Sequence, residues 1–214
     1  MNMKFYSKIS SMLVAAAFLS ILPVEAQIFR QTKQGITGTT QGMDIEIQFI
    51  SPEIVRVVKA PEGRSFTKKS LSVVKSPESM SVTTEKKGET VSLKSNAVRV
   101  DFNVETGRIS FFDKQGKALF TEKDYGAQFT PFNDAGNQTF SVCQAFLLDK
   151  DEAIYGLGQQ QVDDLNQRNQ KHFMRQRALH ASVPIIQSTK VSGMFWDNYS
   201  PTTYTDNPQE MSFD

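Results

Sequence analysis

The 214-residue chain carries 24 lysines and arginines against 23 aspartates and glutamates. Because these charges nearly cancel, no long-range field attracts nucleic acid or an anionic membrane, and we expect neither as a partner. The single cysteine, Cys143, excludes an internal disulfide, so an apolar core has to hold the fold. It lies in the apolar segment 140–146, which is typical of a packing residue rather than a nucleophile.

The N-terminus, residues 1–26, has the features of a secretory signal peptide. Two lysines precede an apolar run over 12–22, and small residues come before a predicted cleavage site between Ala26 and Gln27. The run is short for a membrane span, although an uncleaved N-terminal anchor is the alternative. We expect an exported, periplasmic protein with no membrane association beyond export, in which residues 27–214 form one domain.

The mature chain predicts β-strands almost throughout. Apolar residues occupy every second position over 43–49, which gives one buried face and one wet face. A second strand is predicted at 54–58. Segments 81–86 and 90–94 flank Gly88 as a hairpin, because glycine readily adopts the positive φ of a tight turn.

The same alternation continues further along the chain. Strands are predicted at 98–104, 109–112 and 118–120, with turns at Gly107 and Gly116 between them. Short strands separated by frequent turn signals favour an antiparallel β-sandwich over repeated βαβ units. Sixteen phenylalanines suit a wide core between two sheets. We therefore predict an all-β fold, an antiparallel β-sandwich.

Two further stretches complete the prediction of local structure. The Ser-, Thr- and Lys-rich stretch 65–84 is predicted as an edge strand or hairpin. Residues 133–137 are predicted to form a turn, because they match a calcium loop only weakly. No helical period is convincing outside the signal peptide, except around a short turn at 163–170.

Metal and cofactor sites are not indicated. His172 and His180 lie eight positions apart, without the nearby ligands that close a zinc site. The pair Gly156 and Gly158 lacks the third glycine of a dinucleotide fingerprint, and no phosphate-binding loop is present. The sequence predicts no metal and no cofactor.

Carboxylates are the groups that a glycosidase needs. A retaining enzyme places two of them about 5–5.5 Å apart across the scissile bond. Asp163 and Asp164 are neighbours in sequence, and Asp149, Asp151 and Glu152 cluster in one predicted turn. Adjacent side chains on a strand point to opposite faces, and carboxylates in turns face water, so we predict no catalytic pair here.

The polar run 159–170 is a candidate binding loop. Its amides and Arg168 could bind sugar hydroxyls, or they could simply solvate the loop. Trp196 has two similar interpretations: its ring could stack on a sugar, although Met194 and Phe195 beside it favour a core position.

Motifs in the second half of the chain point to a family. They are Tyr-Gly-Leu-Gly-Gln at 155–159, Leu-Asn-Gln-Arg at 165–168, then Pro184, Ser188, Lys190, Gly193 and Trp-Asp-Asn-Tyr-Ser at 196–200. Together they resemble the N-terminal β-domain of glycoside hydrolase family 31, which contains α-xylosidases and α-glucosidases. The motif residues assigned a structural role are Tyr155, Gly156, Gly158, Asn166, Pro184, Gly193, Trp196, Asp197 and Asn198.

This resemblance implies a galactose-mutarotase-like sandwich and a non-catalytic role. In the family the two catalytic aspartates lie on a (β/α)₈ barrel, and here the matching segments are expected beyond Asp214. The chain is then the N-terminal portion of a retaining α-glycosidase that acts on oligosaccharides, and supplies scaffold and one wall of the substrate pocket. It would meet oligosaccharide only together with the barrel. The alternatives are a free-standing carbohydrate-binding module and a truncated gene product without independent function.

The resemblance also indicates where sugar contacts would lie. The family's loop before Pro184 leans over the sugar pocket, so Gln176, Arg177 and His180 are the predicted substrate contacts, together with Arg168.

Several residues depart from the family pattern. Asn169, Val191 and Val162 stand where glycine is usual, and Ser192 replaces a tyrosine. Because other residues avoid conformations that glycine permits, we expect the sugar-facing loop to be shaped differently.

In the family the sandwich packs against the barrel. The isolated domain should therefore expose an apolar face near Phe195 and Phe213 and should tend to self-associate.

Overall fold

The computed structural model describes residues 29–64 and 69–214, so the predicted signal peptide lies outside the described residues. Over this part of the chain there are β-strands and no helix, and hence no helix that could cross a membrane. The strands are β1 (Phe29–Gln31), β2 (Gly35–Thr40), β3 (Met43–Ser51), β4 (Ile54–Pro61), β5 (Thr83–Lys87), β6 (Thr90–Lys94), β7 (Val98–Asn103), β8 (Ile109–Asp113), β9 (Ala118–Asp134), β10 (Asn137–Leu147), β11 (Ile154–Gln159), β12 (Lys171–Met174), β13 (Ala181–Ser188), β14 (Ser192–Phe195), β15 (Thr202–Asp206) and β16 (Met211–Phe213).

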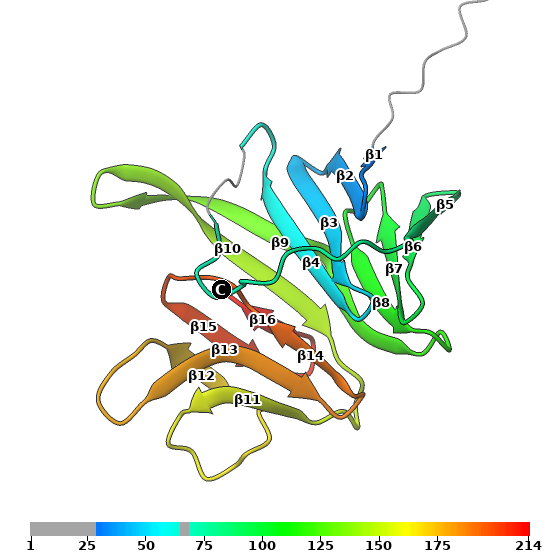
Figure 1. Cartoon of the computed structure of the whole chain (residues 1–214). Coiled ribbons are helices and arrows are strands. Elements are labelled where there is room, and N and C mark those ends of the chain that lie inside the picture. Colours follow the sequence, from blue (N-terminus) through cyan, green and yellow to red (C-terminus); the bar gives the residue numbers. More distant parts are fainter. Residues whose placement is uncertain (1–28, 65–68) are drawn as a thin grey trace, which may run out of the picture.

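The strands form three sheets (Figure 1). A four-stranded sheet has the order β1-β2-β3-β4, and a nine-stranded sheet has the order β12-β15-β16-β10-β9-β8-β7-β6-β5. A three-stranded sheet, β11-β13-β14, lies below them in the figure. Neighbouring strands are antiparallel, as in the pairs β3–β4 and β9–β10. The predicted all-β antiparallel sandwich is confirmed.

The first core lies between the four-stranded sheet and one half of the nine-stranded sheet. In β3 the buried and partly exposed residues alternate, as the period of two in its sequence predicted. The buried members of this core are Ile36, Met43, Ile45, Ile47, Phe49, Val91, Leu93, Val100, Phe102, Val104, Ile109 and Ala127.

The second core lies between the three-stranded sheet and the other half of the nine-stranded sheet. Its buried members are Phe120, Phe146, Ile154, Leu157, Met174, Ile186, Tyr204, Met211 and Phe213. Phe111 on β8 packs against both cores and so links them. The motif-rich second half of the chain therefore folds around a core of its own on a shared sheet.

A buried ion pair crosses between the two sheets of the first core. Lys59 Nζ on β4 lies 2.7 Å from Glu122 on β9, and their side chains are only 6% and 4% exposed. Glu122 also accepts the backbone N–H of Ile109 at 2.9 Å. Burial raises the pKa of Glu122, although the charge of Lys59 opposes this shift. The carboxyl is thus costly to ionise without its lysine.

The longest strands, β9 and β10, form a hairpin arm whose tip extends beyond the neighbouring strands of the nine-stranded sheet (upper left in Figure 1). Its two-residue turn has Ala135 and Gly136 at φ of 49° and 99°. The predicted turn at 133–137 is confirmed. The arm itself was not predicted: the apolar segment 140–146 lies in β10, but no partner strand was expected for it.

The predictions for the other turns and for 65–84 have different outcomes. Gly88, Gly107 and Gly116 have positive φ, as predicted for the tight turns. The predicted edge strand or hairpin at 65–84 is wrong for residues 69–82, which form no strand. This polar segment instead runs along the folded domain outside any strand, and backbone hydrogen bonds such as that from the N–H of Glu78 to the O of Ile50, at 2.9 Å, attach it there.

Candidate functional site

The family-like motifs meet on the three-stranded sheet and in the loops around it. The Tyr-Gly-Leu-Gly-Gln segment forms β11, Pro184 lies in β13 and Gly193 lies in β14. Since β13 is the central strand, these motifs are neighbours in space although up to 38 positions separate Tyr155 from Gly193.

Glycines in β11 permit a bulge against β13. Gly156, Leu157 and Gly158 have φ of 125°, 63° and 76°, and the register shifts between the two glycines. A Cβ at Gly156 would lie 2.2 Å from Ile185 O, and a Cβ at Gly158 would lie 2.0 Å from Ala181 O. Any side chain at either position would therefore collide with the β13 backbone. The bulge places Leu157, which is 0% exposed, in the second core.

The loop between β11 and β12 is fixed by its own amide side chains. Asn166 Oδ1 accepts the N–H groups of Ile154 at 3.2 Å and Arg168 at 3.3 Å. Gln167 is buried, and its Oε1 lies 2.7 Å from Nε2 of His172. Tyr204 donates its hydroxyl to Gln167 O at 3.1 Å. These contacts join the loop to the start of β11, to β12 and to β15.

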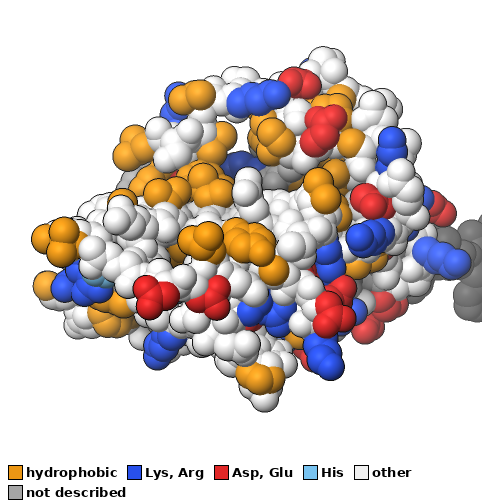
Figure 2. All heavy atoms as spheres, turned by 90° about the horizontal axis from the view of Figure 1, so that it is seen from below, with side chains coloured by type: hydrophobic (Ala, Val, Ile, Leu, Met, Phe, Trp, Pro, Cys, Tyr) orange, Lys and Arg blue, Asp and Glu red, His pale blue; other side chains and the backbone are white. Residues whose placement is uncertain are grey.

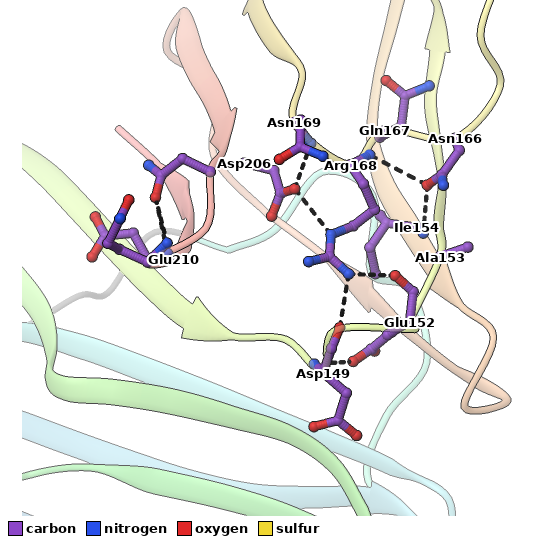
Figure 3. A network of polar contacts seen from close by, with 12 residues as sticks. Asp149, Glu152, Ala153, Ile154, Asn166, Gln167, Arg168, Asn169, Asp206 and Glu210 are labelled. Atoms are coloured by element: carbon purple, nitrogen blue, oxygen red, sulfur yellow. Dashed lines mark hydrogen bonds and ion pairs between the residues drawn. The ribbon is translucent and has the colours of Figure 1, made fainter.

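Arg168 is the centre of a polar network (Figure 3). Its Nε donates to Oδ2 of Asp206 at 3.0 Å, and its Nη1 donates to the backbone oxygens of Asp149, at 2.9 Å, and Glu152. The Asp206 side chain is 1% exposed and also accepts the N–H of Asn169 at 2.6 Å. Several donors of Arg168 are thus used inside the protein, and its contact with sugar stays a prediction.

Glu152 forms a second buried cluster beside this network. Its carboxylate accepts the Ser188 hydroxyl and lies 3.1 Å from Nζ of Lys190. Burial lowers the pKa of Lys190, but hydrogen bonds to Asp149 and Glu152 outweigh it and raise the pKa above its ordinary value. The prediction that the carboxylates of this turn face water is wrong for Glu152, because the β13–β14 hairpin covers it and supplies a counter-charge.

Two of the replaced glycines keep a glycine-like backbone. Asn169 has φ of 59° and Val191 has φ of 61°, whereas Val162 and Ser192 do not have positive φ. The replacements at Asn169 and Val191 therefore do not remove the left-handed conformation. For Asn this is tolerable, but for the β-branched Val191 it is strained.

The predicted sugar contacts gather on the exposed turn between β12 and β13. Gln176 pairs with the backbone of Ser182, donating to its O at 2.7 Å and accepting its N–H at 3.2 Å. Arg177 Nη2 lies 3.0 Å from Nε2 of His180, and the backbones of these two residues form a β-bridge. The structure brings Gln176, Arg177 and His180 together, and places Arg168 in the separate network of Figure 3.

The Trp-Asp-Asn-Tyr-Ser motif follows β14. The Trp196 ring stacks on Phe213 with centroids 5.5 Å apart, and the backbone N–H of Trp196 donates to Pro184 O at 2.8 Å. Asn198 Oδ1 accepts the N–H of Ser200 at 3.0 Å, whereas Asp197 is exposed. The stacking places Trp196 against the second core.

One outer face of the three-stranded sheet is apolar and exposed. Tyr155, Val183, Ile185 and Phe195 are 43%, 42%, 43% and 39% exposed, and Ile185 pairs directly with Phe195. Figure 2 views this side of the molecule, where apolar side chains form patches among charged ones. The expected exposure near Phe213 is wrong: Phe213 is 0% exposed, because Trp196 and Tyr204 pack on its ring.

Reactive groups are not concentrated near these motifs. In residues 29–64 and 69–214 no group of three or more His, Cys, Asp and Glu side chains could hold a metal ion. Burial, followed by the charges of Asp214 and Glu210, raises the pKa of Cys143 to about 11. Its thiol is therefore protonated at neutral pH, as suits a packing residue.

The partners of Arg168 and Glu152 could not be predicted from the sequence. Asp206 lies 38 positions from Arg168, and Lys190 lies 38 positions from Glu152. No local spacing marks these pairs, because the fold alone brings them together.

Comparison with known proteins gives these motifs a context. The family model of the glycosyl hydrolase 31 N-terminal galactose mutarotase-like domain matches residues 44–204. An α-xylosidase of Saccharolobus solfataricus is 30% identical over 168 residues, which cover 74% of this chain and 22% of the relative.

Solved structures agree with this match. A family 31 α-xylosidase from Xanthomonas citri superposes with a TM-score of 0.78 at 30% identity, over 83% of this chain and 20% of that one. A Flavobacterium johnsoniae dextranase of the same family has a TM-score of 0.70 at 22% identity, over 86% and 24%, which shows a shared fold. The chain thus spans about a quarter or less of the length of these relatives, and it belongs to the N-terminal galactose mutarotase-like domains of glycosyl hydrolase family 31.

Proposed function

We propose that this chain is the non-catalytic N-terminal portion of a retaining α-glycosidase, with an α-xyloside as the first candidate substrate and an α-glucoside as the second. The two carboxylates of the double displacement would come from a catalytic barrel and not from this domain. The domain would supply scaffold and one wall of the substrate pocket. Two of the similar proteins named above are α-xylosidases, which favours the α-xyloside.

The observation that carries the proposal is the exposed apolar face of the three-stranded sheet. Tyr155, Val183, Ile185 and Phe195 each keep about two fifths of their surface in water, although the opposite face of the sheet is a packed core. An apolar patch on an otherwise polar surface marks a site of contact with another protein surface. A catalytic domain that covers this patch would remove it from water.

The position of the turn at 175–180 supports the proposal that this domain forms one wall of the substrate pocket. This turn leads directly into β13, whose residues Val183 and Ile185 belong to the apolar face. A domain docked on the face would thus lie beside Arg177, an exposed guanidinium next to His180. Guanidinium and imidazole donors suit recognition of sugar hydroxyls at the rim of a pocket.

Activity measurements test the non-catalytic assignment. The purified chain alone should release no product from aryl α-xyloside or aryl α-glucoside. Turnover above the buffer background by the pure chain would contradict the proposal. The reading frame after the codon for Asp214 offers an independent check, because it should encode a barrel with the missing aspartates.

A chimera tests the scaffold and wall roles. Residues 44–204 would replace the aligned segment of the Saccharolobus solfataricus α-xylosidase. Ile185→Lys should abolish its activity on aryl α-xyloside by charging the docking face, whereas Val74→Lys, at a position 91% exposed, should not. Arg177→Ala should raise KM with little change in kcat, since a rim contact binds ground and transition states alike. The exposed Lys114→Ala is its control.

The two alternatives, a free-standing carbohydrate-binding module and a truncated product without independent function, predict other results. A free-standing binding module should show heat on titration with xyloglucan or malto-oligosaccharides, with the heat lost in Arg177→Ala. A product without independent function should give neither heat nor an active chimera. Equal activity of the Ile185→Lys and Val74→Lys chimeras would remove the argument for docking on this face.

A further inference from the structure

The turn between β12 and β13 is closed by four residues, Arg177 to His180. The backbone N–H of His180 donates to Arg177 O at 3.1 Å, and these two residues form an isolated β-bridge. Leu179 has φ of 67° whereas Ala178 has no positive φ, which is the pattern of a type II turn. Directly opposed residues of an antiparallel pair have their side chains on the same face, so this turn makes the side chains of Arg177 and His180 neighbours.

Two contacts fix the position of the proton on the His180 ring. Nε2 of His180 lies 3.0 Å from Nη2 of Arg177, and because a guanidinium can only donate, Nε2 is the acceptor and carries no proton. The proton of the neutral ring is then on Nδ1, which lies 3.3 Å from Ala178 O and donates to it. Both ring nitrogens are therefore used inside the turn, and His180 has no N–H left for a sugar hydroxyl.

The amide of Gln176 is also used inside the turn. Its Nε2 donates to Ser182 O at 2.7 Å, and its Oε1 accepts the N–H of Ser182 at 3.2 Å. The hydroxyl of Ser182 in turn donates to Arg175 O at 3.2 Å. These three hydrogen bonds join the two ends of the turn at the start of β13, so the side chain of Gln176 stabilises the shape of the turn.

Arg177 is the residue of this turn whose side-chain donors remain available. A guanidinium has five N–H groups in a planar fork, and over residues 29–64 and 69–214 the Arg177 side chain has one hydrogen-bond partner, Nε2 of His180. Arg177 is exposed, so the contact with His180 restricts a side chain that would otherwise lose rotamer freedom on binding a ligand. The remaining N–H groups of the fork are therefore oriented before any ligand arrives.

We propose that Arg177 is the substrate-contacting residue of this turn and that His180 is a positioning residue, which orients the guanidinium through its acceptor nitrogen. The inference rests on the proposed function, in which the turn lies at the rim of the substrate pocket, and it reduces the three expected contacts of the turn to one. The free donors of a planar fork suit two adjacent hydroxyl oxygens of a neutral sugar ring, which they can bind together.

Nitrogen NMR of the histidine rings tests the position of the proton. The chain alone would be labelled with nitrogen-15 and measured at about pH 8, above the titration range of an ordinary histidine. His180 should carry its proton on Nδ1, whereas His172, the other histidine of the chain, should carry it on Nε2, which contacts the acceptor Oε1 of Gln167. In Arg177→Ala the ring of His180 should lose its preference for Nδ1, while unchanged His172 signals verify that the fold is intact.

Kinetics of the chimera with the Saccharolobus solfataricus α-xylosidase test the positioning role. His180→Met removes the acceptor nitrogen and should raise KM about two- to tenfold with little change in kcat, the effect of about one hydrogen bond. His180→Gln, whose amide oxygen can accept from Arg177, should restore KM to within about twofold of the native turn. In the Arg177→Ala background His180→Met should have no further effect, because His180 acts through Arg177.

Each of four results would overturn the inference. In the NMR experiment these are a His180 proton on Nε2 in the native chain and a His180 ring that Arg177→Ala leaves unchanged. In the chimera they are a KM that His180→Met leaves unchanged and a His180→Met effect that persists in the Arg177→Ala background. The NMR experiment uses the chain alone, so it decides the inference separately from the proposed function, which an inactive chimera would contradict.

Discussion

Arg168 and Asp206 form an ion pair in which Nε and Oδ2 lie 3.0 Å apart. This pair connects the loop before β12 to the end of β15. The Asp206 side chain is 1% exposed and that of Arg168 is 17% exposed, so water screens the pair poorly. The arginine of the Leu-Asn-Gln-Arg motif thus has a structural partner independent of any sugar.

Replacing Arg168 by methionine should destabilise the fold strongly. The substitution keeps much of the side-chain volume but leaves the Asp206 carboxylate buried without its counter-charge, which costs about 3–5 kcal/mol. Urea unfolding followed by circular dichroism measures the loss. Arg177→Met is the matched control, because Arg177 is exposed and should change the free energy of unfolding by about 0.5 kcal/mol or less. Equal effects of the two substitutions would refute the structural role of Arg168.

Much of the fold could be predicted from the sequence, because its signals are local. Alternating apolar residues locate β3, and Gly107 lies in a turn that needs positive φ. Contacts between distant segments have no such signal. The Lys59–Glu122 pair joins residues 63 positions apart, and the buried state of Glu152 depends on a hairpin that follows much later.

The candidate site also has features that the sequence predicts and features that depend on contacts between distant segments. Motif glycines could be found because their spacing is distinctive, and the structure explains Gly156 and Gly158 by their approach to β13. The exposed face near Phe195 could be expected only from the family resemblance. That Phe213 is buried could not be predicted, because the stacking of Trp196 on it is a tertiary contact.

Val191→Gly should stabilise the protein. Val191 is 96% exposed and has φ of 61° in the loop that joins β13 to β14, a position usually taken by glycine in three-residue hairpin loops. Relief of the left-handed strain should exceed the added entropy of unfolded glycine, for a gain of about 1 kcal/mol. Thermal and urea unfolding measure it. Asn169→Gly is the comparison, since Asn tolerates its φ of 59°, and should change stability by about 0.5 kcal/mol or less. A loss of stability in Val191→Gly would show that the valine side chain has a role in the fold.

Lys59 and Glu122 should show strong coupling in a double-mutant cycle. Lys59→Met alone leaves a buried carboxyl without its charge partner and should cost about 3–5 kcal/mol at neutral pH. The double variant with Glu122→Gln keeps an acceptor for the Ile109 N–H and removes the charge, so it should be more stable than Lys59→Met.

This cycle also has a pH dependence. Burial raises the pKa of Glu122, and the loss of Lys59 raises it further. Relative to the native protein, the cost of Lys59→Met is therefore full above the pKa of Glu122 in the folded variant. It shrinks as the pH falls from there to the lower pKa of Glu122 in the folded native protein. Urea unfolding at several pH values measures this, and additive single effects would contradict the coupling.

His172 should make the stability of the fold sensitive to mild acid. It is 7% exposed, lies beside the Tyr204 ring and contacts Gln167, and burial lowers its pKa below the ordinary value. As the pH falls through about 6.5, unfolded His172 takes up a proton while folded His172 stays neutral. The unfolded state is then favoured. The contribution of this residue lowers the free energy of unfolding by at most about 1.4 kcal/mol per pH unit, until the pKa of folded His172 is reached.

In His172→Gln the titrating group is gone, while an amide donor to Gln167 Oε1 remains. Urea unfolding at pH 7.5, 6.5 and 5.5 should show the advantage of the native chain over His172→Gln shrinking with acid, and parallel pH curves for the two proteins would refute the role of His172.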